Sequence, residues 1–449
     1  MAYAEKRGTG KTPWRARYKR PDGTLGSEPG FRTKKAAEDW GEDQEAAIRA
    51  GRWQDPEKAR TPFAEFVPIW MAAQKVAPAT VIKRQRLLTR HLIPGFGTTK
   101  LCEINIFTAR AWGNKQTCAQ STVNHALTLL SMILTGAADA GYLLANPMYG
   151  RRRQSDRAVH DVSQQQGEVA HAPDDDEEVW AQPEDAYRLY QRLGGVEGLM
   201  VASACYTGLR WGELAGLHRS NVLLPRVDDL DGKPFERTVL RIDPKVGALH
   251  EVEFALEGEE LASWHKAEDE RLAACLEKGW KANRRKEPKG QVRLYLGPPK
   301  NKTSAREVDL PPFLVKLWER HLAEWSHDYV FCTPGAAGAW WRRGNYSRVL
   351  RPAADGRDAI PVKRGFAGRG EWAPILPGFT MRGARHTHDT WMKEDRVDRA
   401  LRFKTQGWAV TGDIEGVYEH VTPQMRKERL DALEARWERG KRLALAQVS

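Results

Sequence analysis

Hydrophobic and polar positions alternate along the first part of the chain before they take up a helical spacing. Bulky and basic residues alternate from Trp14 to Tyr18, which is the period of a strand with two different faces. Thr33 is a residue type that caps helices, and Gly51 is one that ends them. The elements that we expect are strands at 14–18, 25–28 and around 30–32, followed by a helix at 34–50. The pattern predicts a small module, residues 1–57, built from a three-stranded sheet and one helix.

The spacing of apolar residues is helical between residues 60 and 150. Val123, Leu127 and Leu130 repeat at intervals of three and four residues, and the stripe continues through Ile133 and Leu134. Helices are expected at 61–74, from 78 to a break at 94–97, at 108–115, and from 121 to the end of the region at 146–147. A stripe of this kind is the core-facing side of a helix, so residues 60–150 are predicted to form a helical bundle.

Residues 151–182 are poor in the large apolar side chains that a core needs. The segment begins with three arginines at 151–153 and later contains the acidic run Asp174–Glu178. A polar, charged stretch of this composition is typical of a flexible linker. We therefore expect a boundary between two domains here.

The remaining residues, 183–449, contain both helical and strand-like patterns. The expected helices lie at 183–193, 196–217, 311–325, 339–354, 380–393, 395–405, 413–420 and 425–444, and the expected strands at 237–242, 250–254 and 307–310. A charged segment at 257–290 interrupts the strands and is expected to be a helical insertion with a basic end. The predicted fold class is mainly α with small β-sheets (α+β), with a mixed α/β domain at the C-terminal end.

Charge and cysteine content limit the classes of partner and the compartment that we expect for this protein. The chain has 71 Lys and Arg against 59 Asp and Glu, a formal net charge of +12 and a sequence pI of about 9.4, which favours a polyanionic partner such as nucleic acid. The five cysteines form no C-x-x-C pair, which argues against a disulfide framework or a zinc knuckle and favours a reducing cytosol. No secretory signal or bilayer-spanning apolar run is visible, so we expect a cytoplasmic, nucleoid-associated protein that does not contact a membrane.

Two groups of basic residues are candidates for contact with DNA. They are Arg15, Arg17, Lys19 and Arg20 in the N-terminal module, and Lys83, Arg84, Arg86 and Arg90 in the helical bundle. A sheet face that carries basic residues can lie in a DNA groove, and a basic row on a helix can contact phosphates. Both groups also fit a solvated charged surface, and spacing alone does not separate the two interpretations.

Four segments of the large domain combine residue types that can act on an anionic substrate. They are Thr207–Leu217 with Arg210, the polar stretch Pro299–Pro311 with Lys302, the helix start Met381–Asp389, and Gly407-Trp408 with Tyr418 ten residues beyond Trp408. In the first segment, Gly208 precedes Arg210 within an apolar helical stretch. This indicates a junction between two helices that places the arginine at a surface or cleft.

The order and spacing of these segments resemble the tyrosine recombinase, or phage integrase, family. Residues 207–217 match the family's T-G-x-R-x-x-E-L-x-x-L box over its whole length, and residues 418–423 match its Y-x-H-x-T-P ending. The resemblance covers 183–449, and the two regions before it look like the family's helical core-binding (SAM-like) domain and its arm-type DNA-binding module. It implies an enzyme that cleaves and rejoins DNA through a 3′-phosphotyrosine intermediate and needs no cofactor.

The resemblance also implies a role for each residue that matches the motifs. The implied catalytic residues are Arg210, Lys302, Arg382, Arg385, Trp408 and the nucleophile Tyr418, with Glu213 supporting Arg210. Two guanidinium groups suit the negative charge that builds on the phosphate oxygens. A phenol, with an ordinary pKa of about 10, becomes a usable nucleophile beside such cations. The 5′ hydroxyl that leaves must receive a proton, and Lys302 is the expected general acid.

One position departs from the family pattern. The family's His-x-x-Arg box reads Arg382-Gly-Ala-Arg385 here, so arginine stands where the family has histidine. Arginine can hold the phosphate or orient the tyrosine, but it cannot accept a proton near neutral pH. His386 is more typical of a packing residue. His386 and His388 lie two apart on a helix, which directs them to different faces rather than to one metal ion.

Three functions remain open. The favoured one is a site-specific integrase that integrates or excises a mobile element between attachment sites on double-stranded DNA. A type IB topoisomerase-like enzyme would use the same chemistry for relaxation, and a DNA-binding regulator would have lost catalysis. The N-terminal module and the C-terminal helix favour the integrase.

In that helix, Leu430, Leu433 and Trp437 share one face, which we expect to dock on a neighbouring subunit, the alternative being packing on its own domain. The resemblance implies a homotetramer on DNA, because exchange of two duplexes needs four cleavages. The sequence leaves open an accessory DNA-bending protein or an excision factor as a further partner.

Overall fold

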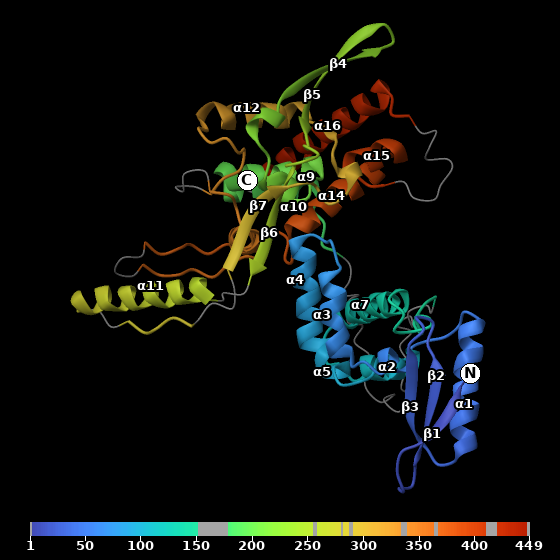
Figure 1. Ribbon diagram of the computed structural model, residues 1–449. Helices are drawn as coiled ribbons and strands as arrows, with labels where there is room; N and C mark the ends of the chain where they lie inside the picture. Colours follow the sequence, from blue (N-terminus) through green and yellow to red (C-terminus); the bar gives the residue numbers. More distant parts are fainter. Residues whose placement is uncertain are drawn as a thin grey trace, which may run out of the picture. The chain divides into compact units, whose positions relative to one another are not determined.

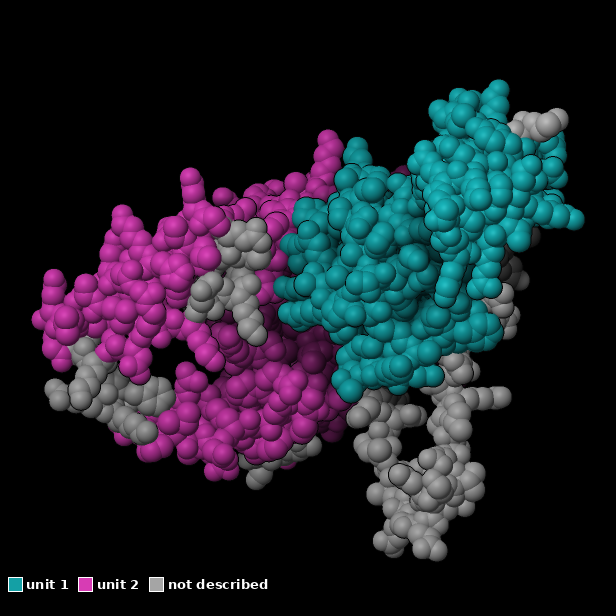
Figure 2. Space-filling model, turned by 60° about the horizontal axis from the view of Figure 1, so that its bottom comes forward, with its two compact units in different colours: residues 1–167 teal, residues 168–449 magenta. Residues whose placement is uncertain are grey.

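The computed structural model describes residues 2–150, 178–254, 258–279, 282–286, 291–333, 339–362, 367–409 and 420–446 (Figure 1). The chain forms two compact units, residues 1–167 and 168–449, which have different colours in Figure 2. Helices dominate and the sheets are small and antiparallel, which confirms the predicted fold class. The expected helix at 413–420, except for its last residue, and most of the expected linker lie outside the described residues, as does Tyr418. None of the described helices is both long and apolar enough to cross a membrane.

The first unit begins with an antiparallel sheet of three strands covered by one helix. The elements are β1 (Tyr3–Lys6), β2 (Trp14–Lys19), β3 (Leu25–Phe31) and α1 (Lys34–Arg49), with strand order β1-β2-β3. Ala16 and Tyr18 are buried, and the Tyr18 ring lies 5.5 Å from the Trp40 ring of α1. Thr33 caps α1 as expected, since its side chain accepts the N–H of Ala36.

The strand prediction for this module was partly wrong. Residues 25–31 form one strand rather than two. This strand, β3, lies at the edge of the sheet, and its pairing with β2 contains a register shift. An edge strand with such an irregularity tolerates a proline, here Pro29. The third strand is instead Tyr3–Lys6, which is too short to show a hydrophobic period.

The rest of the first unit is a helical bundle. Its elements are α2 (Pro56–Ala59), α3 (Phe63–Ala72), α4 (Pro78–Leu87), a π-helical turn (Leu88–Leu92), α5 (Ile93–Phe96), α6 (Ile106–Asn114) and α7 (Gln120–Asp139). Leu130, Ile133 and Leu134 of the predicted stripe are fully buried. The helix break was expected at 94–97, but the helical backbone continues through Phe96. Pro94 lies in the first turn of α5, directly after the wider π turn, and a proline is tolerated there because no backbone N–H is needed.

Helices surround a central buried helix in the second unit. They are α8 (Pro183–Leu193), α9 (Gly195–Thr207), α10 (Trp211–Ala215), α12 (Pro312–Glu324), α13 (Arg343–Asp355), α14 (Met381–Glu394), α15 (Arg399–Gln406) and α16 (Pro423–Ala446). All but two residues of α9 are buried, and α8 and α14 pack against it. The single helix expected at 196–217 is two helices separated at Gly208, which confirms the predicted junction.

Two small antiparallel sheets flank these helices. One contains β4 (Leu224–Leu230), β5 (Lys233–Arg241) and β8 (Glu307–Asp309) in that order, and the other pairs β6 (Ala248–Phe254) with β7 (Gln291–Gly297). The expected insertion between β6 and β7 contains α11 (Gly258–Glu277). In Figure 1 the β4–β5 hairpin and α11 both project from the body of the unit. The pattern did not predict β4, whose Pro and Asp residues are unusual in strands.

The expectation that the C-terminal helix docks on a neighbouring subunit was wrong. Leu433 and Trp437 of α16 are buried in the core of their own unit. The Trp437 ring stacks on the Phe313 ring, with centroids 4.2 Å apart and planes at 7°. The ring of Tyr206 on α9 packs against the edge of Trp437 at 5.7 Å. This apolar face is therefore covered within one chain.

Candidate functional site

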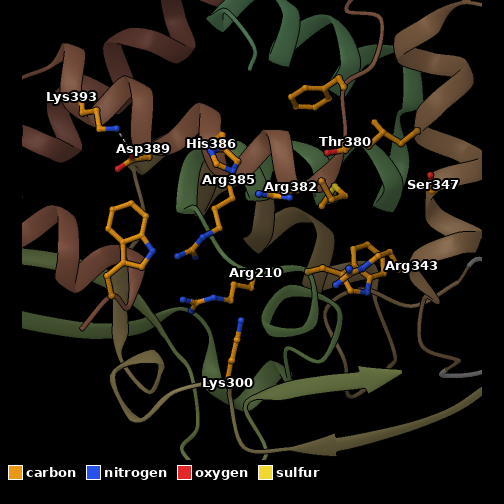
Figure 3. Close-up of a pocket in the computed structure, with 15 residues that line it drawn as sticks. Arg210, Lys300, Arg343, Ser347, Thr380, Arg382, Arg385, His386, Asp389 and Lys393 are labelled. Carbon is orange, nitrogen blue, oxygen red and sulfur yellow. Dashed lines mark ion pairs between the residues drawn. The ribbon is translucent and has the colours of Figure 1, made fainter. Parts of the chain in front are cut away.

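The second unit contains a cavity of about 800 Å³ whose lining is rich in cations (Figure 3). Its lysine and arginine residues are Arg210, Lys300, Arg343, Arg382, Arg385 and Lys393, and Asp389 is its acidic lining residue. Figure 3 shows the side chains of Arg210, Lys300 and Arg385 pointing toward the same space, although they come from distant parts of the sequence. This excess of positive charge suits an anionic ligand.

Arg210 stands at the N-cap position of α10, and its guanidinium is held by three partners. Nη1 donates to Glu213 Oε1 and to Ser304 Oγ, both at 2.9 Å. Nη2 donates to the carbonyl oxygen of Gly407 at 3.3 Å. The backbone N–H of Arg210 donates to Glu213 Oε2 at 3.0 Å. A guanidinium fixed in this way needs little reorganisation before it binds an anion.

Gly208 makes the turn that leads to Arg210. Its φ of 65° lies in the left-handed region, which glycine adopts without strain. A Cβ at this position would lie 2.7 Å from Cδ2 of His388, so space also requires glycine. The carbonyl oxygen of Gly208 accepts a hydrogen bond from Arg385 Nη1 at 2.5 Å. The same turn therefore positions both arginines.

Glu213 holds a second arginine that the sequence analysis missed. Arg306 Nη2 lies 3.1 Å from Glu213 Oε2, and Arg306 also donates to the carbonyl oxygens of Thr405 and Ser304. Burial alone would raise the pKa of the Glu213 carboxyl, but Arg306 and Arg210 outweigh it and hold that pKa below its ordinary value. Arg306 matches no position in the motifs named above. Its position directly before a strand that contains buried residues is the one sequence feature that could have indicated it.

Arg385 on α14 lies beside Arg210. Its Nη2 donates to the carbonyl oxygen of Gln406 at 2.5 Å, next to the Gly407 carbonyl that Arg210 contacts. Burial, and then the charge of Arg210, lower the pKa of Arg385 to about 9, which leaves the guanidinium protonated at neutral pH. The Trp408 ring also lines the cavity, with its centroid 5.9 Å from Arg385 Cζ.

Two lysines line the cavity, Lys300 and Lys393, and the candidate Lys302 is not one of them. Lys302 is exposed at the start of a short 3-10 turn (Lys302–Ser304) and is not among the lining residues. Lys300, two residues earlier, lines the cavity with Arg210. In Figure 3 the Lys300 side chain points toward the Arg210 guanidinium.

Arg382, at the family's histidine position, lines the cavity near the start of α14. Its Nε lies 3.1 Å from Glu178 Oε2, although 78% of the Arg382 side chain is exposed. The other oxygen of Glu178 accepts the hydroxyl of Thr380, the N-cap residue of α14, at 3.2 Å. Arg382 therefore already has an anionic partner within the chain.

The two histidines of α14 lie on different faces, as expected. His386 is exposed and lines the cavity, so it is not a packing residue. His388 is fully buried, and its Nδ1 lies 3.0 Å from the carbonyl oxygen of Cys205, to which it must donate. Its Nε2 accepts from Arg429 Nη2 at 3.3 Å. No group of three or more His, Cys, Asp or Glu suited to a metal ion occurs among the described residues.

The candidate DNA-contact residues of the first unit divide into two kinds. Arg20 pairs with Glu57 at 2.9 Å, and Arg84 donates to Gln74 while its Cζ lies 5.0 Å from the Trp70 ring centroid, so these two arginines already have partners within the first unit. Arg15, Arg17 and Lys19 alternate with the buried Ala16 and Tyr18, which places them on the sheet face away from the core. Arg17 pairs there with Glu5 at 3.0 Å. Lys83 and Arg90 are exposed on the bundle, and Arg86 also lies there.

No family model matches the chain. Among curated proteins it is 24% identical over 237 residues to the prophage phiRv2 integrase of Mycobacterium tuberculosis, in two strains. The match covers 51% of this chain and 57% of that integrase, so the chain spans little more than half the length of these relatives.

Among solved structures, the chain is similar to the Tn1549 transposon integrase in complex with transposon right end DNA, at 14% identity and a TM-score of 0.47, with coverage of 84% of this chain and 99% of that one. It is also similar to a lambda integrase in a tetramer bound to a Holliday junction, at 12% identity and a TM-score of 0.43, with coverage of 92% and 93%.

The four motif segments and the sequence similarity to a prophage integrase point to the same class of protein. The chain resembles the tyrosine recombinases of the phage integrase type.

Proposed function

We propose that this protein is a site-specific DNA recombinase that integrates or excises a mobile element by cleaving and rejoining double-stranded DNA at attachment sites. The observation that supports this most is the convergence of Arg210 and Arg385. Their guanidiniums donate to the adjacent carbonyl oxygens of Gly407 and Gln406, and Figure 3 shows both side chains directed into one cavity. Two fixed guanidiniums side by side suit the non-bridging oxygens of a phosphodiester.

The reaction begins with the phosphate between the two arginines. The negative charge on its non-bridging oxygens grows toward the transition state, so preorganised cations stabilise that state more than the ground state. Glu213 contributes indirectly, because it holds Arg210 in place. Trp408 packs at the edge of the same cavity and offers an indole N–H to the phosphate.

Tyr418 is the proposed nucleophile, on the match of residues 418–423 to the family's ending. Its phenol oxygen forms a bond to phosphorus, and the bond from phosphorus to the 5′ oxygen breaks. The leaving oxygen takes a proton from Lys300, which lines the cavity beside Arg210, whereas the other lining lysine, Lys393, is paired with Asp389. The phenol proton goes to His386, the imidazole in the lining, since Arg382 cannot accept it. The phosphotyrosine retains the bond energy for rejoining.

The partners follow from this chemistry. Each copy supplies one nucleophile, and exchange between two duplexes needs four cleavages, so four copies act together on DNA. The basic row on β2, with the half-buried Arg15 and the exposed Lys19, is the proposed second DNA contact, in the first unit. A relaxing enzyme of the topoisomerase type would need no second DNA-binding module. An accessory DNA-bending protein or excision factor is a further proposed partner.

The test is capture of the covalent intermediate. The full chain is incubated with a pool of duplexes of random sequence that carry a nick, so that the cleaved fragment diffuses away and the adduct accumulates. Wild type is expected to form a protein–DNA adduct that resists denaturation, and Tyr418→Phe is expected to form none. Tyr149→Phe is the matched control, because Tyr149 is 80% exposed and lies in the first unit.

An adduct with Tyr418→Phe, or none with wild type, contradicts the proposal. A second assay separates the integrase from a topoisomerase. Duplexes recovered from the adducts are placed on two plasmids, and the integrase is expected to join the plasmids. Relaxation of supercoils without joining would favour the topoisomerase.

A further inference from the structure

We propose that Arg343 and Ser347 form a second phosphate-binding position in the same cavity, for the DNA phosphodiester next to the one that is cleaved. This inference rests on the proposed function and assigns a DNA contact to a helix that carries none of the motif residues. Both residues line the cavity from α13, and Figure 3 shows them on the opposite side from Lys393.

The two side chains are available for a ligand. Arg343 and Ser347 are both exposed, and they lie four residues apart, which places them on the same face of α13. Neither side chain has a hydrogen bond or an ion pair with any of the described residues. Lys393, by contrast, lies 2.7 Å from the carboxylate of Asp389, which offsets its charge.

Arg343 is positioned relative to the cleavage residues by a shared carboxylate. Glu251 Oε1 accepts the backbone N–H of Arg343 at 2.5 Å and the indole N–H of Trp211 at 3.0 Å. Trp211 follows Arg210 directly, and its ring lies 5.5 Å from the ring of Tyr346 on α13. The starts of α10 and α13 are therefore joined by a hydrogen-bonded and a packed contact. The Arg343 backbone is fixed relative to Arg210 before any ligand binds.

The cavity has room for more than one phosphate group. Its volume of about 800 Å³ lies in the range of sites that enclose whole ligands rather than single groups. Successive phosphates on a DNA strand repeat the same charge at short intervals. A strand that places one phosphate between Arg210 and Arg385 brings its neighbour toward another part of the lining. The positive end of the 13-residue helix α13, with Arg343 in its first turn, suits that second anion.

The first test is the salt dependence of DNA binding. A phosphate contact releases counterions, so its loss lowers the slope of log affinity against log salt by about 1. Arg343→Ala is expected to show this change and to lose about tenfold in affinity, as for a charged hydrogen bond. Arg348→Ala is the matched control, because Arg348 is exposed on the same helix but does not line the cavity. Equal slopes for the two variants would overturn the inference.

The second test locates the phosphate. Duplexes with a single uncharged methylphosphonate linkage at each position around the cleaved bond are bound to wild type and to Arg343→Ala. Wild type is expected to lose affinity at one neighbouring linkage, and Arg343→Ala is expected to be insensitive there. Ser347→Ala is expected to weaken the same position by a smaller factor. If Arg343→Ala stays as sensitive as wild type at every linkage, the inference is wrong.

Thermal unfolding of each variant shows whether the fold is intact, and Arg343→Lys, which keeps the charge, is expected to recover the slope. The adduct assay with wild type and Tyr418→Phe reports on the proposed function, whereas the Arg343 slope reports on the second phosphate. Either one can therefore fail while the other holds.

Discussion

Arg382 Nε lies 3.1 Å from Glu178 Oε2, so the residue at the family's histidine position is paired with the first described residue of the second unit. The same carboxylate accepts the hydroxyl of Thr380 at the N-cap of α14. A DNA phosphate that needs Arg382 must compete with Glu178 for it. The contact also joins the start of the unit to the helix that carries Arg385.

Replacing Glu178 by Gln is expected to strengthen DNA binding. The substitution removes the competing charge but keeps an oxygen for the Thr380 hydroxyl. Because Arg382 is mostly exposed, the gain is at most about 1 kcal/mol, or about fivefold in affinity. The measurement is DNA affinity at low salt, with Glu319→Gln as a control, since Glu319 is an exposed acid on α12 outside the cavity lining. Weaker binding by Glu178→Gln would show that the pair positions α14 instead.

The two lysines of the 299–311 segment are expected to behave differently. Lys300→Ala should slow cleavage by about 100- to 10,000-fold, the usual contribution of a general acid. Lys302→Ala should stay close to wild type, because Lys302 does not line the cavity. A substrate with sulfur in place of the 5′ bridging oxygen provides the check, because a thiolate leaves without a proton. That substrate should restore cleavage by Lys300→Ala, and the opposite pattern for the two lysines would return the role to Lys302.

His386 is expected to accelerate cleavage as the acceptor of the phenol proton. His386→Gln keeps a polar side chain but removes the imidazole base, so cleavage should slow by about 100- to 10,000-fold. The measurement is the rate of adduct formation under single-turnover conditions. An unchanged rate in His386→Gln would remove the residue from the mechanism and leave the other assignments intact.

The buried His388 is expected to make the second unit less stable at mildly acidic pH. Burial, followed by the charge of Arg429, holds the pKa of His388 well below its ordinary value. As pH falls through about 6.5, His388 therefore takes up a proton in the unfolded chain but stays neutral in the folded chain. Stability is lost as pH falls below that value, with a slope of at most about 1.4 kcal/mol per pH unit.

The measurement is the midpoint of denaturant unfolding between pH 5 and 7.5. His388→Asn keeps a donor for the Cys205 carbonyl and should remove the part of the slope that His388 contributes. His386→Asn is the control, because His386 is exposed on the same helix. Equal slopes for the two variants would contradict this origin of the pH dependence.

The sequence contained enough to predict that Arg210 follows a junction between two helices and reaches a cavity. Gly208 interrupts an apolar helical stretch two residues before Arg210, and left-handed backbone is the common reason for such a glycine. The choice between Lys300 and Lys302 could not be made in this way. Both stand in one polar turn, and which of them faces the cavity depends on the path of the loop between β7 and β8. That path is set by packing rather than by the local sequence.

The residues that cover an apolar helix face are harder to predict from sequence than the face itself. The spacing of Leu430, Leu433 and Trp437 correctly indicated an apolar face on the last helix, yet the same pattern fits any apolar partner. Phe313 and Tyr206, which cover Trp437, lie more than a hundred residues earlier in the chain. Arg306 was missed for a similar reason, since its role appears only once Glu213 is seen to be buried beside it.

The packing of α16 on its own unit has a thermodynamic consequence. A protein whose last helix needs a second copy for burial has a folded state that depends on protein concentration through mass action. Trp437 is covered by Phe313 within the same chain, so this contribution to stability is intramolecular. For this helix, folding and assembly are separate equilibria. The unfolding midpoint of the free chain is therefore expected to stay constant with protein concentration, whether or not several copies assemble on DNA as proposed.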